Sequence, residues 1–180
     1  MKLRTKLLLV FILTATGVIA GYKVVNSIFF RPQNPAFNYA PEIKKIKLYF
    51  INRDGKLQAE KREIQGGVGI LEDVKICVKE LAAGPKEAGL FRGLPAGVVL
   101  NGVFIDDNRC IYLDFNQNIV ENQAGGTTRE MQMLYSLVNT VLDNFTQVTS
   151  VRILVEGHEI KTLGGHLDIT QPLRSKQLEY

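Results

Sequence analysis

The chain has 180 residues, of which 46% are hydrophobic and 22% charged. This length suits one ordinary domain with an appendage, and the composition excludes a disordered chain and a polytopic membrane protein. The first 41 residues hold five of the 22 basic residues and none of the 18 acidic ones, so the remainder carries a formal charge of −1. A near-neutral domain has no electrostatic footprint for phosphate backbones, and we therefore expect no nucleic-acid partner.

Residues 1–29 have the pattern of a membrane-targeting segment. Three basic residues (Lys2, Arg4 and Lys6) precede an apolar run over residues 7–20. Two interpretations follow: a signal peptide cleaved after Ala20, which would release the protein, or a retained single-pass anchor with its N-terminus in the cytoplasm. The anchor is favoured because the apolar pattern continues beyond residue 20 without a clean break. In both cases we expect the rest of the chain outside the cytoplasm.

A proline-containing linker is predicted over residues 30–42, a single domain over residues 43–174 and a polar tail over residues 175–180. Prolines prevent a continuous helix and favour an extended chain. We therefore expect the linker to hold the domain away from the membrane.

The domain opens with a hairpin and a helix. Apolar residues alternate over residues 46–50, an Asp-Gly turn follows at residues 54–55, and the returning segment 56–64 is largely polar. That polarity predicts an edge strand, where exposed charge blocks unwanted pairing. Apolar residues at helical spacing over residues 70–81 predict a helix that Gly84 and Pro85 end.

The second half repeats this plan. Pro95 and Gly97 lead into a hairpin over residues 98–105 and 109–115, and an apolar stripe over residues 134–145 predicts a second helix. Glu130 is predicted to form a capping box with Thr127 at the start of that helix.

A third hairpin is predicted from residues 151–155 and 159–163, closed by Gly164 and Gly165, of which at least one is expected to have positive φ. The three hairpins and two helices predict an α+β fold: a two-layer sandwich with a mixed or antiparallel sheet and two helices on one face.

Candidates for chemistry are few. His158 and His166 could join Glu156 or Asp168 at a zinc ion, but they lack the paired spacing of a zinc motif. Asp114 stands without a partner that would make an active site, so a salt bridge or a backbone acceptor is its predicted role. We therefore expect no catalytic residue, no metal and no cofactor.

Cys77 and Cys110 are the only cysteines in the sequence. An extracytoplasmic location permits a disulfide between them. Two small buried thiols are the favoured alternative, because spacing in the sequence cannot establish the close approach that a bridge needs.

Six short motifs appear in order, none specific alone: KLYF at 47–50, VKELAAGP at 78–85, LPAG at 94–97, IYLDF at 111–115, LVNTV at 137–141 and LGGHLD at 163–168. With this order and spacing, residues 45–173 resemble the GerM-type (GerMN) domain of sporulation and spore-germination proteins. The residues that carry this structural motif are Gly84, Pro85, Pro95, Gly97, Asp114, Gly164, Gly165, His166 and Asp168.

The resemblance implies an envelope protein without enzymatic activity. Its implied partners are the membrane, through the N-terminal helix, and other envelope proteins or further copies of itself, because the domain is similar to the ring-building motifs of the sporulation channel. A peptidoglycan-binding or cell-wall-modifying protein is the alternative.

Overall fold

The computed structural model describes residues 19, 21–23, 42–122 and 125–175. The predicted anchor, the linker and the tail therefore lie almost wholly outside the described residues. The chain divides into two units, residues 1–40 and 41–180, and the second unit holds every strand of the described residues. None of the helices among the described residues combines the length and the apolar character needed to cross a membrane.

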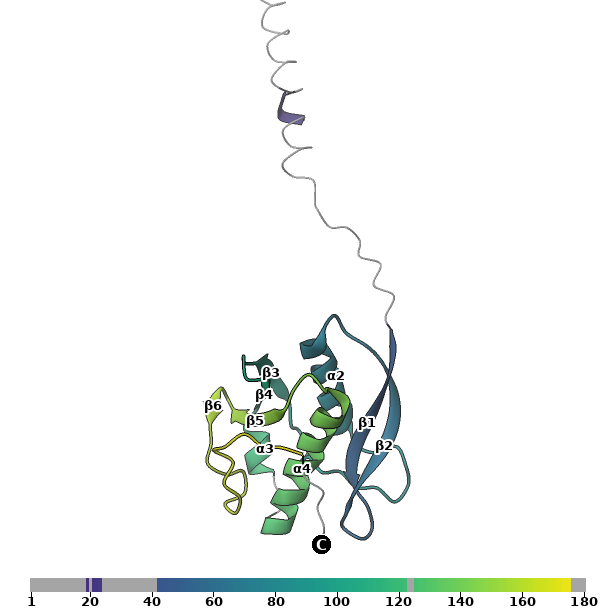
Figure 1. Ribbon diagram of the computed structural model, residues 1–180, viewed down its shortest axis with the longest axis vertical. Coiled ribbons are helices and arrows are strands. Elements are labelled where there is room, and N and C mark those ends of the chain that lie inside the picture. Colours follow the sequence, from purple (N-terminus) through teal and green to yellow (C-terminus); the bar gives the residue numbers. More distant parts are fainter. Residues whose placement is uncertain (1–18, 20, 24–41, 123–124, 176–180) are drawn as a thin grey trace, which may run out of the picture. The chain divides into compact units, whose positions relative to one another are not determined.

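The strands of the domain form two separate sheets (Figure 1). The first is an antiparallel ribbon of β1 (Ile43–Ile51) and β2 (Leu57–Gln65). The second has the order β3-β4-β5-β6, with β4 and β5 parallel and the other pairs antiparallel. Its strands are β3 (Leu100–Ile105), β4 (Cys110–Phe115), β5 (Ser150–Val155) and β6 (His158–Glu159).

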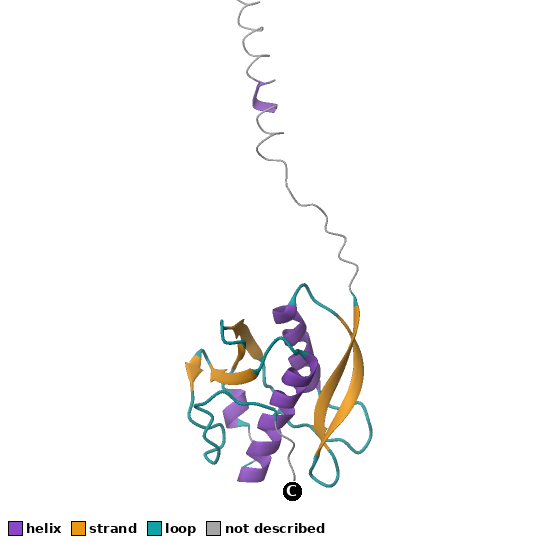
Figure 2. Ribbon diagram, in the orientation of Figure 1, coloured by secondary structure: helices purple, strands orange, loops and turns teal. Residues whose placement is uncertain are grey.

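Two long helices lie between these sheets, as the purple ribbons of Figure 2 show. Helix α2 (Ile70–Ala83) contacts β1 and β3, and helix α4 (Thr127–Asn144) contacts β1, β2 and β5. A short helix, α3 (Asn118–Glu121), was not predicted. The α+β class is confirmed, and the helices cover one face of each sheet. The division of the strands into two sheets was not predicted.

The core gathers the apolar faces of both sheets around these helices. Leu48 and Phe50 of β1, Val74 of α2 and Leu137 of α4 are all buried within it. Cys77 and Cys110 are also buried, and both are free thiols, so the disulfide alternative is wrong.

Leu137→Ala is expected to lower the free energy of unfolding by about 2–5 kcal/mol, because the side chain is 1% exposed and its loss leaves a cavity. Thermal unfolding measures the change. Leu71→Ala is the matched control: Leu71 is 37% exposed on α2, so the same truncation should cost much less. Equal effects of the two substitutions would show that the α4 stripe does not face the core.

Polar side chains of α4 close the free edge of β1. Asn144 accepts a hydrogen bond from the Lys47 backbone N–H (2.9 Å) and donates one to the Lys47 carbonyl (2.7 Å). Tyr49 is held in the same way, with its N–H donating to Thr140 Oγ1 (3.0 Å) and its carbonyl accepting from Ser136 Oγ (2.6 Å). These three polar residues recur every fourth position of α4, so one face of the helix replaces a neighbouring strand.

The segment that follows β5 differs from the predicted third hairpin. Strand β6 covers only His158–Glu159, and the backbone over 160–169 is loop rather than a returning strand. The predicted capping box is also wrong: Gly126 is the N-cap of α4, with no side-chain cap. Both differences have one cause, because the Glu130 side chain binds the backbone of that loop instead of its own helix terminus.

Candidate functional site

Glu130 is fully buried and organises the closing loop. Its Oε1 accepts three hydrogen bonds and its Oε2 two. The donors are the Thr162 hydroxyl (2.6 Å) and the backbone N–H groups of Leu163 (3.0 Å), Gly164 (2.8 Å), His166 (2.9 Å) and Leu167 (3.2 Å). Burial alone would raise the pKa of the Glu130 carboxyl, but the hydrogen bonds from Thr162 and the loop backbone outweigh it and hold that pKa below its ordinary value.

The motif residues of this loop shape its backbone. Gly165 has φ 90°, as expected for one of the two glycines, and its N–H donates to Thr162 Oγ1 (2.8 Å). His166 contributes its backbone N–H, while its side chain is exposed. Asp168 Oδ1 accepts hydrogen bonds from the Thr170 N–H (2.9 Å) and hydroxyl (2.6 Å), and these lower the pKa of Asp168. Each residue thus has a structural part in the turn.

Gly165→Val is expected to destabilise the domain by about 1–2 kcal/mol, because a β-branched residue is strained at positive φ. The space around the added Cβ is open, so the cost comes from the backbone alone. His166→Ala keeps the N–H that Glu130 uses, and it should change stability by less than about 0.5 kcal/mol. Chemical denaturation of both variants checks the order, and the reverse order would contradict a structural role for the turn.

Asp114 and His158, which the sequence suggested as candidates for chemistry, contact the backbone of neighbouring residues. Asp114 accepts a hydrogen bond from the Gly157 N–H (2.7 Å), which ties the β5–β6 turn to β4. The ring of His158 lies 2.7 Å from the Glu156 carbonyl through Nδ1. Over residues 42–122 and 125–175, no three His, Cys, Asp or Glu side chains gather as a metal site would require.

The other motif residues hold the long loop between α2 and β3. Gly84, at φ 93°, ends α2, and Pro85 follows it. Gly97 has φ 76°, and its carbonyl accepts hydrogen bonds from the side-chain amides of Asn116 (3.1 Å) and Asn118 (2.7 Å). Pro95 lies two residues earlier in the same loop.

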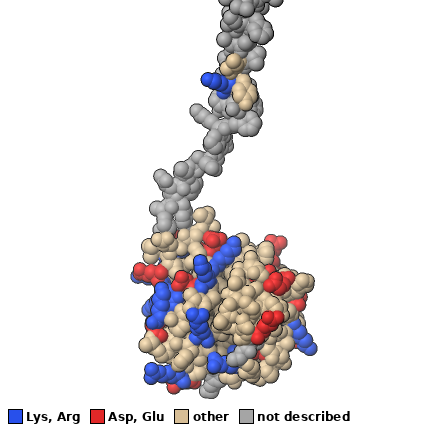
Figure 3. Space-filling view, turned by 180° about the vertical axis from the view of Figure 1, so that it is seen from behind, with Lys and Arg blue, Asp and Glu red and all other residues tan. Residues whose placement is uncertain are grey.

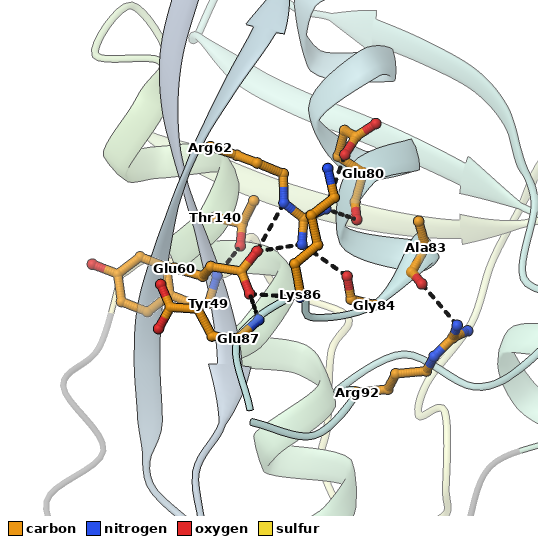
Figure 4. A network of polar contacts seen from close by, with 10 residues as sticks. All are labelled: Tyr49, Glu60, Arg62, Glu80, Ala83, Gly84, Lys86, Glu87, Arg92 and Thr140. Atoms are coloured by element: carbon orange, nitrogen blue, oxygen red, sulfur yellow. Dashed lines mark hydrogen bonds and ion pairs between the residues drawn. The ribbon is translucent and has the colours of Figure 1, made fainter. Parts of the chain in front are cut away.

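Glu60 and Arg62 form a buried ion pair that the sequence pattern did not predict (Figure 4). These side chains are 2% and 5% exposed, although the polar composition of β2 predicted exposed charge. Arg62 Nε donates to Glu60 Oε1 (2.8 Å), and Arg62 Nη2 contacts the same oxygen. The sequence did contain one indication. Glu60, Arg62 and Ile64 occupy alternate positions of the strand, so all three side chains lie on its inner face.

The pair extends into α2 and the loop that follows it. Arg62 donates to the Glu80 carboxylate (2.9 Å) and to the Gly84 carbonyl (2.8 Å). Glu60 Oε2 accepts from the backbone N–H groups of Lys86 (2.8 Å) and Glu87 (2.9 Å). Burial would raise the pKa of Glu60, but these amides and Arg62 hold it below its ordinary value. Every acceptor and donor is thus used within the fold.

Strand β3 differs from β1 and β2, the two outer strands of the first sheet. The outer edge of β1 is closed by α4, and β2 carries exposed charges such as Lys61 and Glu63. Strand β3 contains no charged residue. At the end of the β3–β4 hairpin the Asp106 N–H donates to the Cys110 carbonyl, so these two residues form a hydrogen-bonded pair. Hydrogen-bonded and non-hydrogen-bonded pairs alternate along antiparallel strands, and the N–H and C=O groups of the β3 residues 103 and 105 therefore point away from β4. We call this the open β3 edge.

Apolar hollows lie on the two faces of the sheet near β3, one at the start of the strand and one at its end. A groove of about 300 Å³ between α2 and the start of β3 is lined by Lys75, Val78, Lys79, Ala82, Val98, Val99, Leu100 and Phe115. A hollow of about 290 Å³ on the other face is lined by Phe104, Ile105, Asp106, Tyr112 and Leu154. Phe104 is 58% exposed and Ile105 39%. The edge and these two hollows form a candidate surface for an extended polypeptide.

These features define a small α+β domain whose loops are fixed by buried carboxylates. A family model described as "Germane: Sporulation and spore germination" matches residues 47–161, and the chain belongs to this family. The match covers most of the domain and confirms the resemblance to GerM-type domains.

Solved structures show the same fold. The first GerMN domain of the sporulation protein GerM from Bacillus subtilis is similar at a TM-score of 0.61 and 21% identity, over 73% of this chain and 97% of that one. The tandem GerMN domains of the same protein match at a TM-score of 0.59 and 19% identity, over 74% of this chain. The chain spans 46% of that tandem structure. No curated protein sequence matches the chain.

Proposed function

We propose that this protein is a non-enzymatic, membrane-anchored module that brings envelope proteins together during sporulation or spore germination. The family supports the sporulation context. The basic and apolar pattern of residues 1–29 supports the anchor and a domain outside the cytoplasmic membrane. The open β3 edge is the observation that carries the proposal, because an uncharged edge strand flanked by apolar hollows is a ready template for another polypeptide.

The other polar groups of the domain favour a structural role over catalysis. The buried carboxylates of Glu60 and Glu130 are saturated by hydrogen bonds from within the fold. Acidic and basic side chains both occur on the face of the domain that Figure 3 presents.

Site-specific photo-crosslinking in sporulating or germinating cells tests the assembly function. A photoreactive phenylalanine analogue at position 104 is expected to give crosslinks to envelope proteins. The same analogue at position 61, on the charged β2 edge, is the matched control and should give few. Equal crosslinking at both positions, or none at position 104, would contradict the proposal.

Two biochemical measurements test the remaining parts. The full chain should fractionate with membranes and resist carbonate extraction, whereas a mature N-terminus at Gly21 would overturn the anchor.

Incubation of the full chain with peptidoglycan should release no soluble muropeptides. Release that is lost on Asp114→Asn would replace the assembly role with the cell-wall alternative.

A further inference from the structure

We propose that the open β3 edge binds an extended acidic segment of another protein, whose backbone adds as a strand beside β3 and whose glutamates face α2. This inference rests on the proposed function and specifies the partner chemistry. Its first support is the backbone: residues 103 and 105 present N–H and C=O groups that no other described residue bonds. A strand added there would satisfy them, and main-chain pairing of this kind supplies affinity in peptide recognition.

The second support is the charge beside the groove. Lys75 and Lys79 are exposed and lie one turn apart on α2, and no acidic residue lines the groove with them. A like-charge pair at this spacing disfavours a helix by a few tenths of a kcal/mol. Lys75 pairs loosely with Glu72 (3.4 Å), which lies one turn earlier on the same helix. An incoming carboxylate would relieve the repulsion that remains.

The spacing of the two lysines fits a strand. Four helical residues rise by about 6 Å, and residues i and i+2 of a strand are about 6.7 Å apart on the same face. Glutamates at alternate positions could therefore reach Lys75 and Lys79 together. Their methylene stems would lie against the apolar lining of the groove, such as Val78 and Ala82.

The opposite side of the added strand would meet the outer hollow. On that face its residues would lie beside Phe104, the β3 residue of the hollow, with Tyr112 one strand further in and Leu154 two strands further in. Phe104 and Tyr112 face each other across β3 and β4, and the aromatic pair offers a flat apolar contact. A peptide that fits both faces of this edge therefore alternates acidic and apolar residues.

A second copy of this chain fits the surface less well. Joining two β3 strands about a two-fold axis would place both α2 helices on the same face of the combined sheet. Lys75 and Lys79 of each copy would then approach those of the other, and like charges across an interface are unfavourable. The charges therefore favour an acidic partner over self-association.

Peptide binding to the full chain in lipid nanodiscs tests the inference. The probes are three fluorescent peptides that alternate valine with glutamate, with glutamine or with lysine. We expect the glutamate peptide to bind most tightly, with affinity that falls as salt is added. The double substitution Lys75→Glu with Lys79→Glu should weaken the glutamate peptide by roughly tenfold or more and strengthen the lysine peptide.

Proline substitutions separate strand addition from simple charge attraction. Ile105→Pro removes an outward N–H, which an edge strand tolerates, and should abolish binding of the glutamate peptide. Lys61→Pro, which removes an outward N–H from the β2 edge, is the matched control and should leave binding unchanged. Circular dichroism of both variants verifies the fold.

Several outcomes would overturn the inference. One is equal binding of the three peptides, and another is glutamate-peptide binding that survives Ile105→Pro. A third is self-association of the full chain that Ile105→Pro abolishes, because a second copy would then be the occupant. If no peptide binds while position 104 still crosslinks to envelope proteins in cells, the acidic-strand inference fails and the proposed assembly function stands.

Discussion

Replacement of Glu130 by alanine is expected to lower the free energy of unfolding by about 4 kcal/mol, among the largest effects of any single substitution in this domain. The side chain is fully buried and accepts five hydrogen bonds, four of them from backbone N–H groups. Alanine would leave those donors without an acceptor. Each hydrogen bond to a charged group contributes about 1.5–3 kcal/mol, and the five act as one unit, so the contributions do not add.

Denaturant unfolding of the wild type and the variant measures this effect. Arg129→Ala is the matched control, because Arg129 precedes Glu130 on α4 and is exposed. It should change stability by no more than about 0.5 kcal/mol. Hydrogen exchange should also show that the amides of residues 163–167 lose protection in Glu130→Ala. A change below about 1 kcal/mol, with protection retained, would show that water replaces the carboxylate.

The same carboxylate makes stability depend on pH. The folded-state pKa of Glu130 lies below its unfolded value, so its contribution is complete above the unfolded pKa and is lost as pH falls through the folded pKa. Glu60 and Asp168 have lowered pKa values as well and act in the same direction. The stability gap between the wild type and Glu130→Gln should therefore narrow below about pH 4. A gap that is constant from neutral to acidic pH would contradict an ionised Glu130.

Periodicity predicted the elements that local sequence controls. The alternation over residues 46–50 became β1, and the stripe over residues 134–145 became the buried side of α4. Gly84 ends α2 as predicted. Each signal works because an amphipathic pattern and a helix stop depend on neighbours a few residues away.

The features that failed depend on distant partners. Glu130 lies three residues after Thr127, which matches a capping box, but its partners lie more than thirty residues later in the chain. The open edge of β3 follows from strand order, because β4 and β5 pair in parallel through the crossover that contains α4. Hairpin signals concern only strands that follow one another in the chain, so they cannot identify which strand lies at the edge of the sheet.

Replacement of Arg62 by leucine is expected to destabilise the domain by about 3–5 kcal/mol, because it leaves the Glu60 carboxylate buried without its counter-ion. The guanidinium also bonds the Glu80 carboxylate and the Gly84 carbonyl, and it lies 5.7 Å from the centre of the Phe50 ring. Arg62→Lys should recover little of this loss. A single ammonium cannot reproduce the planar set of donors that reaches the two carboxylates and the carbonyls of Glu80 and Gly84 at once.

A double-mutant cycle separates the pair from its surroundings. Glu60→Gln combined with Arg62→Leu removes both charges and should be less destabilised than Arg62→Leu alone, because no uncompensated charge remains in the core. Lys61→Leu, which changes an exposed residue between them on β2, should alter stability by no more than about 0.5 kcal/mol. Additive effects of the two core substitutions would contradict a coupled pair. Coupling would show that the two side chains act as one buried charge pair, and this pair bonds the end of α2 and the loop after it.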